Sequence, residues 1–300
     1  MEASARSLQG RDVIPALAEI YPQLYLTPGE QSREEYDRIV KTGYRPTGRS
    51  LAHIPGSEED SLLPEQTPAG VVAVITLARR EDFECFLQIM AHRCMPDPIP
   101  PTQGAAILDG VVNWTKIREH KAAYLAAEGA QADWSAEFAR FTADKRNYRD
   151  ALIILSAGPY SAVSAQRAGF DEAEWLKASH TIRRAHECTH FICRRLYPDR
   201  IDAVWDELVA DAVGICAALG RFDPALEELF LGVSESGYTG GRLENYVDGP
   251  ENRQERLDLL AKKVHRTLCR FEKLLAAWGE KEPYELAIRL EEEIGCWKQL

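Results

Sequence analysis

Hydrophobic positions follow two different patterns along the chain, and the change comes near residue 160. Before it, short apolar runs at residues 71–77, 104–114 and 152–156 are typical of strands, and helical periodicity covers residues 30–41 and 83–92. Residues 55–70 are rich in Pro, Gly, Ser and acidic side chains, which indicates a linker or surface loop. The first half therefore predicts a small sheet with a few helices.

Nearly everything after Asp171 has helical periodicity. Asp171 and Glu174 form a capping-box signature, and a second helix is predicted over residues 199–219, ending at Gly220. Amphipathic stretches follow at residues 252–278 and 282–297. We predict an α+β fold in which a small mixed or antiparallel sheet packs on a predominantly helical lobe. The expected parts are an N-terminal helical segment with its linker (1–69), a small α+β lobe (70–160) and a helical lobe (161–300).

Composition narrows the class of protein. The net charge of -11 argues against a nucleic-acid partner and against attraction to anionic membranes. Residues 1–15 lack the pattern of a secretory signal, and the longest apolar stretch, residues 69–78, is too short to span a bilayer. The seven cysteines have no disulfide-framework spacing, which favours free thiols in a reducing compartment. We predict a cytoplasmic protein without a membrane partner; its oligomeric state stays open.

The helical half contains the sequence His-Glu-Cys-Thr-His at residues 186–190. Four residues make slightly more than one helical turn, so the imidazoles of His186 and His190 project from one face and can bind one metal ion. Glu187 lies beside them, where its carboxylate can take a proton from a water that the metal activates. The spacing predicts two zinc ligands and a general base.

A catalytic zinc needs a third protein ligand, and the next predicted helix offers one. Glu207 begins the pattern Glu-x-x-x-Asp, which ends at Asp211 one turn later on the same face. We predict Glu207 as the third ligand and Asp211 as the acceptor for the second ring N–H of a histidine ligand. The short connection between the two helices predicts antiparallel neighbours.

Other metal sites fit less well. A metzincin would have Gly and His where Cys193 and Leu196 stand, and it would have a later Met turn. A di-iron bundle needs two Glu-x-x-His pairs, whereas the chain has one, and no cysteine pair has the spacing of a structural zinc site. These comparisons leave a catalytic zinc site as the best interpretation.

Residues 171–219 resemble the zincin metallopeptidases, specifically the gluzincin branch typified by thermolysin. The resemblance implies that His186, His190 and Glu207 bind zinc, that Glu187 is the general base, and that Asp211 supports a histidine. Asp206 precedes the ligand glutamate here, where the thermolysin-like pattern often has Asn.

Peptide hydrolysis also needs a group that stabilises the oxyanion and an edge that binds substrate. The glycine-rich segment 237–246 carries Tyr246 and Arg242, which we predict as the oxyanion-stabilising residues, with His265 as an alternative. Residues 104–106 or 155–157 are candidates for an edge strand that pairs with extended peptide, although both also fit ordinary core strands.

The functional hypothesis is a zinc-dependent metallopeptidase acting on a peptide or protein substrate. Three alternatives stay open. One is a non-catalytic zincin-like protein that binds zinc or peptide, and another is a zinc amidohydrolase acting on a small non-peptide amide. The third is a helical α+β domain without metal, in which the histidines are ordinary polar residues of a half-buried helix.

Overall fold

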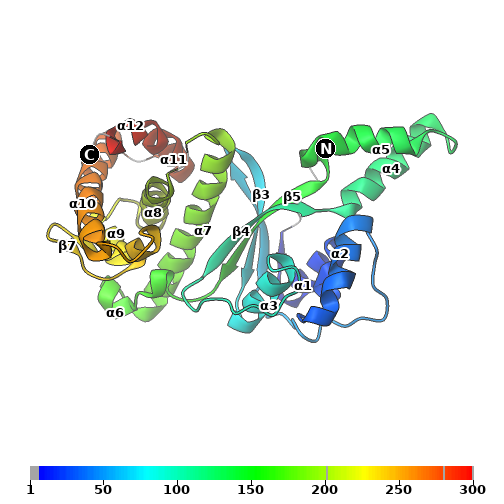
Figure 1. Cartoon of the computed structure of the whole chain (residues 1–300), viewed down its shortest axis with the longest axis horizontal. Helices are drawn as coiled ribbons and strands as arrows, with labels where there is room; N and C mark the ends of the chain where they lie inside the picture. Colours follow the sequence, from blue (N-terminus) through cyan, green and yellow to red (C-terminus); the bar gives the residue numbers. More distant parts are fainter. Residues whose placement is uncertain (1–6, 201, 280, 299–300) are drawn as a thin grey trace. The chain divides into compact units, whose positions relative to one another are not determined.

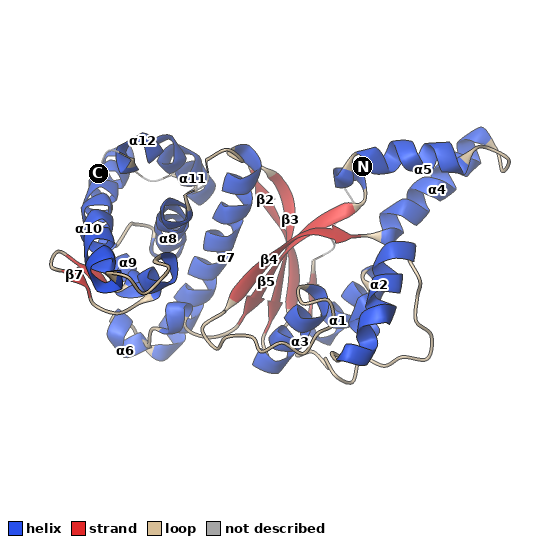
Figure 2. Cartoon of the chain, viewed as in Figure 1, coloured by secondary structure: helices blue, strands red, loops and turns tan. Residues whose placement is uncertain are grey.

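The computed structural model describes residues 7–200, 202–279 and 281–298, apart from the side chain of Cys296. It has an α+β fold (Figures 1 and 2). Two compact units divide the chain. The first unit contains residues 1–65 and 72–156, and the second contains residues 66–71 and 157–300. None of the described helices is long and apolar enough to cross a bilayer.

A mixed sheet is formed by five of the described strands in the order β1-β2-β3-β5-β4. Their bounds are Leu8–Gln9 (β1), Ser61–Thr67 (β2), Gly70–Leu77 (β3), Ala105–Val112 (β4) and Arg149–Ser156 (β5). Strands β3 and β5 are parallel, whereas β4 runs antiparallel to β5. Residues 104–106 therefore lie at an edge strand of the sheet, whereas residues 155 and 156 end an interior strand. Of the two candidate substrate edges, β4 is the one with an open side in this sheet.

Helices of the first unit are α1 (Val13–Ile20), α2 (Arg33–Thr42), α3 (Arg80–Met90), α4 (Trp114–Glu128) and α5 (Trp134–Ala143). Side chains from α1 to α3 share one buried core with the strands, including Ile14, Leu17, Ile39, Ile75, Phe83, Phe86 and Ile154. The N-terminal segment, which the sequence set apart as residues 1–69, thus packs into the same core as the sheet. The strand predictions for 71–77, 104–114 and 152–156 and the helix predictions for 30–41 and 83–92 are confirmed, with shifted ends.

The predicted linker is partly a strand. Strand β2 lies within residues 55–70 and buries Leu62. Its Pro64 lacks an N–H donor, but the pairing of β1 with β2 involves Ser61 and Leu62 in the described residues, and Pro64 lies beyond these two. Pro and acidic residues are typical of loops, which is why the composition predicted one. They are also tolerated in a strand where one side is not hydrogen-bonded to a neighbour.

The second unit is helical. Its helices are α6 (Ala165–Ala168), α7 (Glu172–Leu196), α8 (Ala203–Leu219), α9 (Pro224–Leu231), α10 (Arg253–Trp278), α11 (Pro283–Glu292) and α12 (Ile294–Trp297). A small two-stranded sheet joins β6 (Val233–Ser234) to β7 (Gly237–Tyr238). The buried core includes Trp175, Ile182, Trp205, Val209, Phe230, Leu268 and Phe271. The predicted helices at 252–278 and 282–297 are confirmed, the second with a break between α11 and α12.

Helices α7 and α8 pack against each other and position the candidate site. At Gly214, a Cβ atom would lie only 2.8 Å from the carbonyl oxygen of Ile182, so a side chain there would push the helices apart. Helix α8 begins at Ala203, later than predicted, because Asp202 and not Asp199 caps it: the Asp202 carboxylate accepts from the N–H groups of Val204 and Trp205. Asp171 caps α7 as predicted, accepting from the Glu174 N–H.

Candidate metal centre

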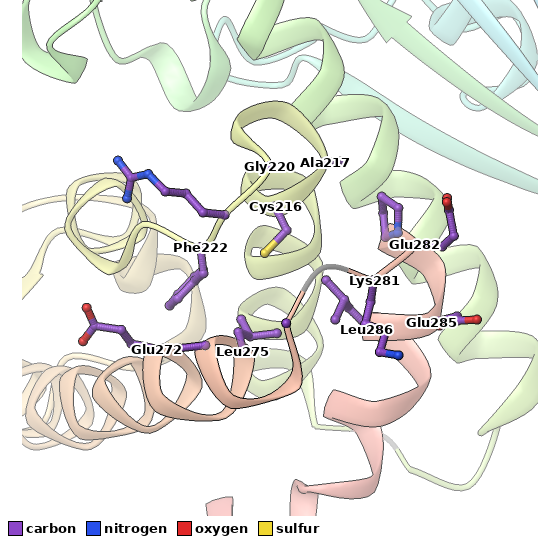
Figure 3. Close-up of a pocket in the computed structure, with 14 residues that line it drawn as sticks. Cys216, Ala217, Gly220, Phe222, Glu272, Leu275, Lys281, Glu282, Glu285 and Leu286 are labelled. Atoms are coloured by element: carbon purple, nitrogen blue, oxygen red, sulfur yellow. The ribbon is translucent and has the colours of Figure 1, made fainter.

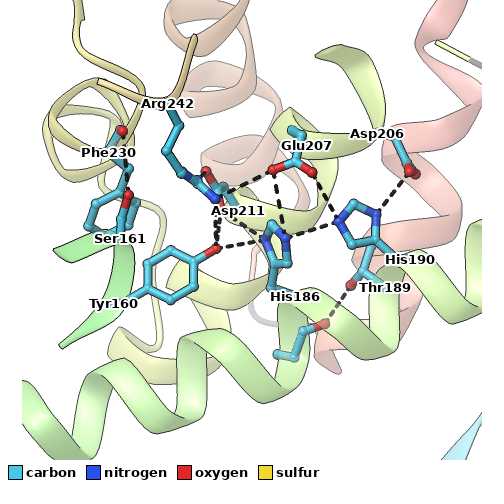
Figure 4. Close-up of polar contacts among 11 residues, drawn as sticks. Tyr160, Ser161, His186, Thr189, His190, Asp206, Glu207, Asp211, Phe230 and Arg242 are labelled. Atoms are coloured by element: carbon cyan, nitrogen blue, oxygen red, sulfur yellow. Dashed lines mark hydrogen bonds and ion pairs between the residues drawn. The ribbon is translucent and has the colours of Figure 1, made fainter. Parts of the chain in front are cut away.

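Three side chains that could hold a metal ion converge between α7 and α8 (Figure 4). His186 and His190 come from successive turns of α7, and both are buried. Their Nε2 atoms lie 3.0 Å apart. Glu207 of α8 places Oε1 3.3 Å from His190 Nε2 and Oε2 3.8 Å from His186 Nε2. The predicted ligand set is thus brought together by two adjacent helices.

The separations between these atoms fit a tetrahedral zinc ion. With metal–ligand distances of about 2.0–2.1 Å, tetrahedral geometry places ligand atoms about 3.3 Å apart. The three observed separations of 3.0, 3.3 and 3.8 Å span that value. Two imidazole nitrogens and one carboxylate leave a fourth position for water or substrate, as in catalytic zinc sites.

Each histidine has a carboxylate on its other ring nitrogen. His186 Nδ1 lies 2.9 Å from Asp211 Oδ1, and His190 Nδ1 lies 2.9 Å from Asp206 Oδ2. A carboxylate only accepts hydrogen bonds, so each Nδ1 carries the proton in the neutral ring, and each Nε2 presents its lone pair. With both rings neutral, two lone pairs and the Glu207 carboxylate would face one another, an arrangement that a cation stabilises.

The pairings also show that the helices are antiparallel, as predicted. His186 contacts Asp211, whereas His190, four residues later, contacts Asp206. Position along α7 thus rises as position along α8 falls.

Arg242 balances part of the negative charge. Its guanidinium forms an ion pair with Asp211 and donates from Nη1 to Glu207 Oε2 at 3.4 Å. The three carboxylates and the one guanidinium leave two net negative charges around the imidazoles, which a single divalent cation would neutralise. Glu227 is fully buried nearby, and burial and the Asp211 charge raise its pKa well above the ordinary value.

Tyr160 completes the hydrogen-bond network around His186. Its hydroxyl donates to Asp211 Oδ1 at 2.6 Å and lies 2.9 Å from His186 Nδ1. Burial raises the pKa of Tyr160 well above its usual value, so the hydroxyl keeps its proton and stays a donor. Tyr160 therefore fixes the carboxylate that in turn orients a predicted ligand.

The segment that holds Tyr160 is tightly bound to α7. The Tyr160 N–H donates to Ser179 Oγ at 2.9 Å, and Arg183 donates to the Pro159 carbonyl at 3.1 Å. Ser161 and Ala162 follow with φ values of 53° and 56°, in the left-handed region that costs free energy for residues with a Cβ. The strained turn is maintained by these contacts and places Tyr160 in the site.

Neighbouring charges shift the pKa values of two predicted ligands, Glu207 and His190. Burial opposes the charged form of Glu207, but His190, His186 and Arg242 outweigh it and hold the pKa of Glu207 well below its ordinary value. For His190, burial likewise opposes the charge, and hydrogen bonds to Asp206 and Glu207 hold its pKa well above the usual range. In both cases neighbouring opposite charges favour ionisation, so the position between the ligands attracts positive charge.

A family profile described as a family of unknown function (DUF7005) matches residues 3–290. The chain belongs to the DUF7005 family. No curated protein and no solved structure matches it. The chemistry of this DUF7005 site is therefore inferred from the geometry of its own residues.

The other residues predicted for the site are placed as follows. Arg242 and Tyr246 both reach Glu207: the pKa of Tyr246 is raised by burial and by the charge and hydrogen bond of that carboxylate. Glu187 is half-buried on α7, and in the described residues its carboxylate has no hydrogen-bond or ion-pair partner. His265 contacts Glu228 and Cys269. The catalytic roles of Glu187, Arg242 and Tyr246 stay predictions.

Glycine at two positions lets the segment before Arg242 reach the site. A Cβ on Gly241 would lie 2.4 Å from the Gly232 nitrogen, so the two backbones meet at a distance that any side chain would prevent. The 3-10 segment Arg242–Tyr246 starts directly after this contact. The glycine-rich sequence thus indicated a close backbone approach, although the approach is to another backbone segment.

Sequence reasoning missed Tyr160 and did not give Asp206 its role. Asp206 could have been found, because it is an acidic residue next to the predicted ligand Glu207 on an α8 helix facing α7. Tyr160 lies 26 residues before His186 in a non-helical turn, so no periodicity links them.

The second unit also has a cavity of about 940 Å³ that is lined by other residues (Figure 3). It is lined by parts of α8, α10 and α11 and the segments beside them, including Cys216, Phe222, Leu275 and Leu286. None of its lining residues belongs to the candidate metal centre.

We expect Tyr160→Phe to weaken zinc binding about 10-fold, because losses in the layer that orients a ligand typically cost 10–100-fold in affinity. The ring would still pack against Phe230, which keeps the core filled. Competition with a chromophoric chelator measures the change, and Tyr197→Phe, on the residue that ends α7, is the matched control. Equal affinity in Tyr160→Phe and the unmodified protein would show that the hydroxyl does not support the site.

Proposed function

We propose that the protein is a zinc-dependent metallopeptidase that hydrolyses peptide bonds. The observation that supports it best is the convergence of His186 Nε2, His190 Nε2 and the Glu207 carboxylate, with a second carboxylate on the Nδ1 atom of each histidine. A pair of histidines in an ordinary helical core does not require both Nε2 atoms and a carboxylate to be directed at one point. Glu187 on the same helix adds a base, and among the described residues its carboxylate has no hydrogen-bond or ion-pair partner.

His186, His190 and Glu207 would hold the zinc, which when bound supplies Lewis acidity that polarises a water and a scissile carbonyl. Glu187 takes a proton from the attacking water on a carboxylate oxygen and passes it to the leaving amine. Asp211, Tyr160 and Asp206 keep the imidazoles in the tautomer with a free Nε2.

Arg242 and Tyr246 remain the proposed donors to the oxyanion. The Arg242 guanidinium already forms ion pairs with Asp211 and Glu207. To stabilise the oxyanion it would need an N–H group that these two carboxylates do not use. Its Nε has no hydrogen-bond partner among the described residues but is buried, so a role for Arg242 on the oxyanion requires the side chain to move. Tyr246 keeps its proton because burial raises its pKa, and a protonated phenol can donate.

We further propose a cytoplasmic location and a peptide or protein substrate. The six cysteines with described side chains are free thiols, which agrees with a reducing compartment.

The test is hydrolysis of a complex peptide mixture by the purified full-length chain, with products identified by mass spectrometry. We expect new peptide termini, loss of cleavage after treatment with a chelator, and recovery on adding one equivalent of zinc. Cleavage that persists without metal would contradict the proposal. Stoichiometric zinc without any cleavage, together with hydrolysis of small amides, would instead assign the site to a non-peptide amidohydrolase.

A further inference from the structure

His265, which the sequence offered as an alternative oxyanion donor, belongs to a separate side-chain cluster. It lies on α10 one turn before Cys269, and Glu228 of α9 lies on its other side. His265 Nδ1 is 2.5 Å from Glu228 Oε1, and His265 Nε2 is 3.8 Å from Cys269 Sγ. The order is carboxylate, imidazole and thiol.

This order decides which atom carries each proton. The Glu228 carboxylate accepts only, so His265 Nδ1 is the donor to it. The neutral ring then has a free lone pair on Nε2, directed at the thiol, and Cys269 donates its S–H to that nitrogen. Such a base next to a sulfur nucleophile, oriented by a third group, is the arrangement that activates thiols.

The other cysteines with described side chains are buried, or burial raises the pKa of their thiols. Cys188 and Cys193 are buried. Burial raises the pKa of Cys85 to about 12, of Cys94 to about 11 and of Cys216 to about 12, which keeps these thiols protonated. Cys269 is partly exposed, as Cys85 and Cys216 are, and the side chains of His265 and Glu228 are 24% and 25% exposed. All three members of the cluster are thus partly open to solvent.

Within two turns of this thiol on α10, the exposed basic side chains outnumber the one exposed acidic side chain, Glu272, although the chain as a whole is acidic. Lys262, Arg266 and Lys273 of α10 are exposed within two turns of Cys269. They favour an anionic reaction partner and the negative charge that develops on sulfur during attack. Arg270 is less available, because it forms an ion pair with Glu293 at 2.9 Å.

We propose that Cys269 is a site of thiol–disulfide exchange with a small anionic disulfide, with His265 as general base and Glu228 as the residue that orients it. His265 Nε2 takes the thiol proton as Cys269 Sγ attacks one sulfur of the disulfide. A new S–S bond forms on Cys269 and the original S–S bond breaks. The departing thiolate takes the proton from the imidazolium, so one disulfide replaces another and no further oxidant is needed.

The experiment treats the full-length protein with oxidised glutathione and follows each cysteine by peptide mass spectrometry over time. We expect Cys269 to react at least about 10-fold faster than Cys216, and His265→Gln to slow Cys269 about 10-fold, because it removes the base. Glu228→Gln should slow it by a smaller factor. His92→Gln, which removes a histidine paired with Asp97 in the first unit, is the matched control and should have no effect.

A rate for Cys269 equal to that of Cys216 would overturn the proposal, and so would an unchanged Cys269 rate in both His265→Gln and Glu228→Gln. Melting curves of each variant show whether the fold is retained. The inference does not depend on the metal centre, since oxidised glutathione reports on Cys269 whether or not zinc is bound.

Discussion

His186→Ala should purify with almost no zinc, whereas the unmodified chain should contain about one equivalent. The variant loses one of three protein ligands and leaves Glu207 and His190 facing an incomplete site. Since losses in the supporting layer alone cost 10–100-fold, we expect the loss of a ligand to weaken binding by more than about 100-fold. Elemental analysis of the purified protein measures the stoichiometry.

His180→Ala is the matched control on the same helix. His180 lies six residues before His186 and is not part of the convergent set, so this variant should keep its zinc. Zinc bound equally by the unmodified protein and by His186→Ala would place the metal elsewhere. Absence of zinc from both, even after reconstitution, would leave the metal-free α+β domain as the remaining interpretation.

The second unit was the more predictable part of the chain, for a physical reason. Helix α7 is specified locally: Asp171 caps it, and its apolar positions recur with the helical period. The spacing of His186 and His190 then follows from helix geometry. Glu207 could be predicted as well, because a short connection constrains the next helix to pack beside the first.

Side chains that reach the site from outside the α-helices were harder to place. Arg242 was found because glycines mark its segment, but the pattern could not show that its guanidinium would bind Asp211 and Glu207. Tyr160 depends on a turn with left-handed φ angles at Ser161 and Ala162, a conformation that those residue types do not favour. The positions of side chains such as Tyr160 can be seen only from the contacts of the folded unit.

The first unit shows the same distinction. Its interior strands, β3 and β5, were predicted because β-branched and apolar residues dominate them. Helices α4 and α5 were not assigned, and the reason is visible in their exposure: α4 buries only Ile117, so its sequence lacks a clear apolar stripe. Capping by Asn113 and Asp133 is the local signal that marks their starts.

Glu187→Gln should bind zinc normally and lose at least about 1,000-fold in peptide hydrolysis. The substitution keeps the shape of the side chain and removes its ability to take a proton, and general-base catalysis contributes roughly 100-fold to 10,000-fold. Glu187 is not among the residues whose ligand atoms converge, so the metal content should stay at about one equivalent. Initial rates on a cleaved peptide, measured beside elemental analysis, give both quantities.

The rate and the zinc content together show whether Glu187 acts as a general base, as a metal ligand or as a structural residue. Loss of activity with zinc retained assigns the proton transfer to Glu187, whereas loss of both would mean that this carboxylate supports the metal. Glu174→Gln, on an exposed position of the same helix, should change neither quantity. Full activity in Glu187→Gln would refute the general-base role. Because Glu187 has no protein partner in the described part of the chain, the substitution breaks no hydrogen bond there, and a fall in rate can be attributed to chemistry.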